Sequence, residues 1–315
     1  MEFQHRMLRA VVAGIVDKAL RDLPRDPKRG LRNLVDLGDS CAKGPQQKRF
    51  FARAHAALQS PASPYYQLVA DAVSWVDPRV LRTMGVNLGA SGLTWGVGRL
   101  RQEEAARGGH LPWMLLLDGP ARADSPVPRE ANSLGCYIFV LRGADAREAC
   151  ALAGRYPESA FFAELPAAQI TPETAALLEK APNLAVSVEV APETDASGAF
   201  EILHAARRLY GFAAACTLGT ADALTDGTFL DRMRAGHCLY GCFRCPAGEP
   251  ALEDRLYRMV CGDRGRHKGR PLLLIDLRRD AQYVAEAVSP GSRALRVNPA
   301  LPLGPQLSPR SENVI

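Results

Sequence analysis

One short stretch, Leu111-Pro112-Trp113-Met114-Leu115-Leu116-Leu117-Asp118-Gly119, has the pattern of a β-strand that is buried on both faces. Apolar runs of about 4 to 8 residues that end in a polar residue or glycine are typical of parallel strands covered by helices. Asp118 would then lie at the carboxyl end of the strand, where the loops of α/β sheets meet and ligands bind. The loop that follows, 119–126, contains no cysteine and no set of metal ligands.

Further apolar runs follow this stretch, with helical segments of about 10 to 15 residues between them, the spacing of right-handed crossovers. They cover residues 136–141, 160–165, 184–190, 212–218, 237–244, 271–277 and 294–297. We therefore expect residues 111–298 to form a full or partial (β/α) TIM-type barrel. A doubly wound open sheet is the alternative, because one sequence does not show the strand order. The proline- and serine-rich segment 299–315 is expected to be a disordered tail.

Residues 1–110 predict a helical N-terminal module. Apolar residues recur every four positions from Phe3 through Met7 and Val11 to Leu23, which predicts an amphipathic helix that ends at Pro24. Further helices are predicted to begin at prolines that follow an N-cap residue. Five glycines between residues 85 and 98 predict a kinked or closely packed segment.

The composition limits the possible partners and location. The chain has 315 residues, 47% of them hydrophobic, and no apolar run approaches the roughly 20 residues that span a bilayer. We expect a globular cytoplasmic protein without a membrane partner. The net charge of +5 arises in residues 1–110, where 17 Lys and Arg face 10 Asp and Glu. These cations are scattered at helical spacing, which favours a solvated surface or a protein docking surface over nucleic-acid binding.

Several stretches resemble the radical S-adenosylmethionine (radical SAM) superfamily, in its clostridial type with a helical N-terminal region. They are SPYYQLV (63–69), VDPRVL (76–81), VNLG (86–89), LTWG (93–96) and LPWMLLLD (111–118). The resemblance implies a partial TIM barrel. In active members of that family, a CxxxCxxC motif after the first strand binds a [4Fe-4S] cluster, and SAM takes the open iron.

This chain departs from the family at both cofactor motifs. The loop after the first strand has no cysteine, and the glycine-rich turn that receives SAM in the family aligns with Arg142-Gly143-Ala144-Asp145, where one glycine remains. We therefore expect a pseudoenzyme without a cofactor, which acts as a binding or partner protein. A true radical SAM enzyme, or another protein, is the expected partner through the basic N-terminal module.

A CxxxCxxC pattern does occur later, at Cys238, Cys242 and Cys245. In a strand, Cys238 and Cys242 would lie about 13 Å apart on one face and Cys245 on the other, so they would not share a cluster. A loop conformation would let them converge. The alternative function is therefore an active radical SAM enzyme with a [4Fe-4S] cluster and S-adenosyl-L-methionine at these cysteines. A zinc site completed by His237 and His267 is a further alternative.

Polar residues at the expected carboxyl ends of the strands are the other candidates for a site. They are Asp118, Arg142, Glu164, Glu189, Thr217, Arg244 and Asp276. Each carboxylate either marks the point where its strand reaches solvent, or belongs to a pocket in which Arg142 and Arg244 balance the acids. Such a pocket suits a zwitterionic ligand such as an amino acid. It would also suit a non-radical enzyme, although no catalytic triad is recognisable.

Overall fold

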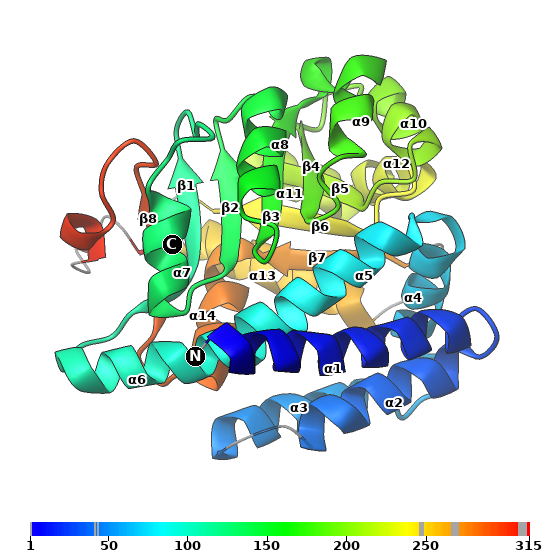
Figure 1. The fold of residues 1–315 in the computed structure, drawn as a ribbon. Coiled ribbons are helices and arrows are strands. Elements are labelled where there is room, and N and C mark those ends of the chain that lie inside the picture. Colours follow the sequence, from blue (N-terminus) through cyan, green and yellow to red (C-terminus); the bar gives the residue numbers. More distant parts are fainter. Residues whose placement is uncertain (1, 41, 43, 246–248, 266–270, 308–313) are drawn as a thin grey trace.

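The computed structural model describes the chain except residues 1, 41, 43, 246–248, 266–270 and 308–313. Its centre is one sheet of parallel strands (Figure 1), in the order β7-β6-β5-β4-β3-β2-β1-β8. The strands are β1 (Pro112–Asp118), β2 (Ile138–Arg142), β3 (Ala160–Pro166), β4 (Leu184–Val190), β5 (Tyr210–Ala215), β6 (Tyr240–Arg244), β7 (Leu273–Asp276) and β8 (Arg293–Val297). The doubly wound order, in which the chain reverses at the middle of the sheet, is thus not the one observed.

Helices cover one face of this sheet, which we call the convex face. They are α7 (Val127–Leu134), α8 (Ala146–Arg155), α9 (Pro172–Leu178), α10 (Ser197–Ala205), α11 (Leu218–Asp226), α12 (Thr228–Ala235) and α13 (Pro250–Gly265). The convex-face core is the largest of the molecule and includes Phe139, Phe161 and Phe212. Alternate residues of the same strands point to the opposite, concave face.

The sheet curls into a half-barrel. Its edge strands β7 and β8 do not pair with each other among the described residues. Helix α14 (Leu277–Val288) follows β7, and its Leu277 and Ala281 pack with Met114 and Leu116 on the concave face. The opening of the half-barrel is therefore filled by a helix.

The N-terminal helices lie at the amino-terminal end of the sheet (Figure 1). They are α1 (Glu2–Asp22), α2 (Pro27–Ser40), α3 (Pro45–Ala57), α4 (Pro64–Trp75), α5 (Pro78–Val86), the π-helix η1 (Asn87–Gly96) and α6 (Val97–Arg107). Val80 and Met84 of α5 share a core with Ala160 of β3 and Ala185 of β4. The segments 1–110 and 111–298, which the sequence separates by pattern, thus share a hydrophobic core.

The described part of the C-terminal segment differs from the expected disordered tail. Leu303 is buried, the short 3-10 helix η3 (Gly304–Leu307) follows it, and Val314 forms an antiparallel bridge with Leu295 of β8. The burial of Leu303 and the bridge from Val314 to the edge strand β8 attach this segment to the half-barrel, although its composition is that of a linker. Among the described residues, no helix has both the length and the apolar character that crossing a bilayer requires.

A buried polar network fastens α1 to the π-helix. Arg9 Nη1 donates to Asn87 Oδ1 at 2.9 Å, and the Asn87 amide donates to the carbonyls of Pro157 and Ser159 at 2.9 and 2.8 Å. The ring of His5 stacks on Trp95 with the centroids 5.1 Å apart. A ten-residue π-helix is rare, and here it brings the polar side chains of η1 to α1 and to the turn before β3.

The end of the π-helix passes very close to the turn between α7 and β2. A Cβ atom added at Gly96 would lie 2.3 Å from the Gly135 carbonyl oxygen, and Gly135 itself has a φ of +102°. The sequence predicted a kinked or closely packed glycine-rich segment, and at Gly96 the backbone does pack too closely against Gly135 for any side chain to fit. Gly98, two residues later in α6, has nothing within 4 Å of the same position.

These two glycines give a matched pair of substitutions. We expect Gly96→Ala to lower the free energy of unfolding by about 1–3 kcal/mol, because the methyl group has no room against backbone. Gly98→Ala should leave it unchanged or raise it by up to about 1 kcal/mol, because alanine favours the helix. Urea denaturation of both variants measures the difference, and equal stabilities would contradict the close crossing.

Candidate functional site

A chain of ion pairs crosses the concave face at the carboxyl ends of the strands. Arg142 Nε and Arg244 Nη1 each lie 2.9 Å from the same oxygen, Oε2 of Glu164. Arg142 Nη1 also lies 3.8 Å from Asp118 Oδ2, and Arg296 Nε lies 3.5 Å from that oxygen. We call these five side chains, Arg296–Asp118–Arg142–Glu164–Arg244, the ion-pair chain. It joins β8, β1, β2, β3 and β6.

The strand register explains the first part of this chain. Asp118 pairs with Arg142 across β1 and β2, and Arg142 pairs with Glu164 across β2 and β3. Residues opposite each other on neighbouring strands point to the same face, so the three side chains form a row of alternating charge.

The contact between Glu164 and Arg244 depends on the curl of the sheet. Two strands, β4 and β5, separate β3 from β6, so a flat sheet would hold the backbones about 14 Å apart. The side chains meet because the sheet bends toward its concave face and the strands between carry small residues there. Gly211 of β5 is one of them, since a Cβ at that position would lie 2.1 Å from the Tyr240 carbonyl oxygen and 2.8 Å from its ring. Tyr240 reaches over Gly211 to Ser187 of β4, with 3.0 Å between the hydroxyl oxygens.

Glu164 is the most buried member of the ion-pair chain. Its side chain is 2% exposed, whereas those of Arg142 and Arg244 are 19% and 22% exposed. Within the ion-pair chain, two atoms are nevertheless buried without a hydrogen-bond partner among the described residues, Glu164 Oε1 and Arg244 Nε. One is an acceptor and the other a donor. Buried polar groups of this kind are almost always satisfied in native proteins, so a donor and an acceptor from a bound molecule or water fit here.

The other predicted site residues form no ion pair with the ion-pair chain among the described residues. Glu189 of β4 is partly exposed, and no ion pair of it is found among the described residues. Thr217 and Asp276 are helix N-caps: Thr217 Oγ1 accepts from the Thr220 amide at 3.1 Å, and Asp276 Oδ1 accepts from the Arg279 amide at 3.0 Å. Asp276 is buried, which raises its pKa above that of an ordinary aspartate. Thr217 and Asp276 therefore cap the first turns of α11 and α14, the helices that follow β5 and β7.

The three cysteines of the CxxxCxxC pattern are divided between the faces of the sheet. Cys242 packs with the concave-face core, and burial raises the pKa of its thiol. Cys238 and Cys245 pack with the convex-face core. Among the described residues, no group of three or more His, Cys, Asp or Glu side chains is placed to hold a metal ion. His267, named above for a zinc site, lies outside the described residues.

Cys216, at the end of β5, lies next to Cys245. A hydrogen bond with the Cys245 thiol, together with burial, raises the pKa of Cys216 well above that of a free cysteine. Cys216 and Cys245 pack with the convex-face core, whereas Cys242 packs with the concave-face core. Burial and the neighbouring thiol favour the neutral form of Cys216.

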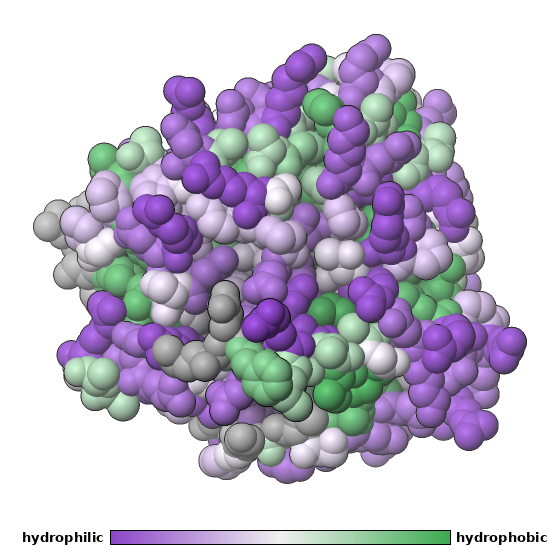
Figure 2. Space-filling view, in the orientation of Figure 1, coloured by the Kyte–Doolittle hydropathy of each residue, from purple (hydrophilic) through white to green (hydrophobic). Residues whose placement is uncertain are grey.

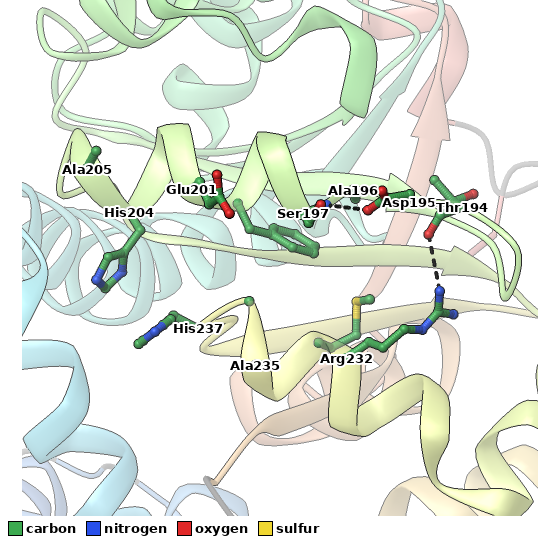
Figure 3. A pocket seen from close by; sticks show the side chains of 13 residues that line it. Thr194, Asp195, Ala196, Ser197, Glu201, His204, Ala205, Arg232, Ala235 and His237 are labelled. Carbon is green, nitrogen blue, oxygen red and sulfur yellow. Dashed lines mark hydrogen bonds between the residues drawn. The ribbon is translucent and has the colours of Figure 1, made fainter.

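A groove of about 520 Å³ lies elsewhere, on the convex side between α10 and α12 (Figure 3). His204 and His237 face each other at one end, with their ring centroids 4.2 Å apart, and Arg232 lies at the other end near Thr194. Two of its lining residues, Gly236 and Phe200, pass close to each other, since a Cβ on the glycine would lie 2.5 Å from that ring. The groove was not predicted from the sequence, because the residues that line it come from α10, α12 and the loops beside them, and β5 and α11 separate these two helices in the chain.

Arg296 is the one member of the ion-pair chain that the sequence did not predict. It lies on the concave face of β8, between Leu295 and Val297 in the chain. The sequence signal for Arg296 was a single cation among the apolar residues of the predicted strand 294–297. Such a residue is as often solvent-exposed at a sheet edge, and Arg296 is indeed 49% exposed.

Comparison with the profiles of known protein families gives no match, and a search of curated proteins finds no significant relative. The resemblance to radical SAM proteins therefore stays a prediction from the sequence. The same holds for a radical SAM enzyme as the partner of the N-terminal module.

The burial of Glu164 leads to a test of the ion-pair chain. Glu164→Ala would leave the guanidinium groups of Arg142 and Arg244 facing each other without a counter-ion, and we expect a loss of about 3–5 kcal/mol in unfolding free energy. Glu189→Ala, on the next strand, should change it by no more than about 0.5 kcal/mol. Urea denaturation compares the two variants. Equal losses would show that the ion-pair chain does not hold the carboxyl ends together.

Proposed function

We propose that this protein binds a small zwitterionic ligand, such as an amino acid, at the carboxyl end of its half-barrel. The observation that carries the proposal is the pair of buried, unpartnered atoms in the ion-pair chain, Glu164 Oε1 and Arg244 Nε. A ligand ammonium group would donate to the first, and a ligand carboxylate would accept from the second.

The charge balance of the site supports a zwitterion. The ion-pair chain holds three arginines and two carboxylates, and Glu189 adds a carboxylate on the neighbouring strand β4. A ligand without net charge leaves this balance undisturbed. Asp118, Arg142, Arg244 and Arg296 are all partly exposed, so the site is open to solvent at the strand ends, where α/β barrels bind ligands.

In this proposal the protein has the architecture of a radical SAM barrel without reductive SAM cleavage. The loop after β1, Gly119 to Pro126, offers no thiol to iron, and Cys238, Cys242 and Cys245 do not converge. The residues present therefore do not fit a three-thiolate cluster at either place. The role is that of a binding protein rather than a radical enzyme.

Thermal unfolding with candidate ligands tests the binding site. An α-amino acid or SAM at about 100 times its dissociation constant should stabilise the protein by about 2.7 kcal/mol and raise the melting temperature by several degrees. Acetate has only the carboxylate and methylammonium only the ammonium group, so each should raise the melting temperature less.

Two arginine substitutions make this measurement specific. Arg244→Lys keeps the charge but removes the Nε–H donor, and we expect it to abolish the ligand-induced shift. Arg293→Lys, an exposed change at the amino end of β8, should retain the shift in full. No shift with any zwitterion, or an equal shift in both variants, would overturn the proposed site.

Anaerobic reconstitution with iron and sulfide tests the absence of radical chemistry. We expect no stoichiometric cluster, because the three cysteines lie on opposite faces of the sheet. A protein that takes up about four irons, with an absorption band near 400 nm that is lost in Cys242→Ala, would instead establish the iron-sulfur alternative.

A further inference from the structure

The outward side of α1 carries a row of exposed apolar side chains. Phe3, Met7 and Val11 are 65%, 54% and 61% exposed, although all three belong to the apolar repeat that predicted an amphipathic helix. The helix instead faces the protein with the side that bears His5 and Arg9, which contact the π-helix. Only the last members of the repeat, including Ala19 and Leu23, are buried. The row is therefore left on the surface.

The exposed charges of α1 are all positive among the side chains that the structure describes. They are Arg6, Lys18 and Arg21. Asp17 is engaged by Arg82, with 2.7 Å between Oδ1 and Nε, and Asp22 is partly buried. Figure 2 shows hydrophobic surface below the centre of the view, in the region where Figure 1 places α1, and hydrophilic surface to its right. An apolar row accompanied by cations is the composition of helices that lie in a membrane interface.

The shape of this surface favours lipid over a protein partner. The exposed face is the convex side of a single helix, and small residues, Ala10 and Gly14, separate its large side chains. A stable protein interface needs about 800 Å² of matched surface on each partner, whereas a fluid interface adapts to any shape. A second copy of the chain would bring the cations of two α1 helices together, which is unfavourable.

We propose that the exposed face of α1 binds an anionic lipid surface. Phe3, Met7 and Val11 enter the boundary between headgroups and acyl chains, and the three exposed cations contact lipid phosphates. The sequence led us to expect no membrane partner because it contains no spanning segment. A helix that lies along the surface does not need one.

Co-sedimentation of the full chain with lipid vesicles tests this proposal. We expect binding to phosphatidylcholine vesicles that contain about one third phosphatidylglycerol, weaker binding at high salt, and little binding to phosphatidylcholine alone. Val11→Glu places a carboxylate in the row, and we expect it to weaken binding at least tenfold. Leu218→Glu is the matched control, because Leu218 is 68% exposed on α11, and it should bind like the unchanged protein.

Melting temperatures of both variants show whether they remain folded. Binding lost in Val11→Glu and kept in Leu218→Glu supports the proposal. It is overturned if anionic vesicles do not bind the protein, or if both variants bind equally. It is also overturned if light scattering without lipid shows a dimer that Val11→Glu dissociates, since a second copy would then cover the row.

Discussion

A buried carboxylate shared by two guanidinium groups is the interaction on which the carboxyl end of this half-barrel depends. Glu164 is almost fully buried, and a charge so placed is tolerated only with close counter-ions. Its partners come from β2 on one side and from β6 on the other, so the same oxygen connects both sides of the sheet. This contact is possible because the sheet curls, and it lies at the carboxyl ends of the strands, where the candidate site is.

The two ends of the concave face are filled differently. Helix α5 brings Val80 and Met84 to the amino-terminal ends of β3 and β4, where the inward residues are alanines. Helix α14 fills the opening beside β8 with Leu277 and Ala281. The carboxyl end has no such apolar cover among the described residues, and arginine and carboxylate side chains take that place. Asp118, Arg142 and Arg244 are partly exposed there, so solvent reaches these side chains at this end of the half-barrel.

Much of this fold was predictable because its signals are local. Apolar runs such as 184–190 coincide with strands, and helices begin at Pro27, Pro64 and Pro78 where a proline follows an N-cap residue. The contact between Glu164 and Arg244 was not predictable, because it depends on how far the sheet curls between β3 and β6. Thr217 and Asp276 were named as site residues because threonine and aspartate at strand ends serve both as ligand contacts and as helix caps.

The N-terminal region shows the same limit of local patterns. Repetition of apolar residues every four positions identified the helix α1, but it did not show which side of α1 would face the protein. The buried side was selected by the polar contacts of Arg9 with Asn87 and by the stacking of His5 on Trp95. Those contacts depend on the π-helix, whose geometry is not encoded by any simple repeat.

A double-mutant cycle between Arg142 and Arg244 tests the central claim most directly. The unfolding free energies of Arg142→Met, Arg244→Met and the double variant give the coupling between two residues that do not share a strand pair. If both guanidinium groups neutralise one buried carboxylate, the two losses should depart from additivity by at least about 1 kcal/mol. Losses that add to within about 0.5 kcal/mol would contradict the shared carboxylate.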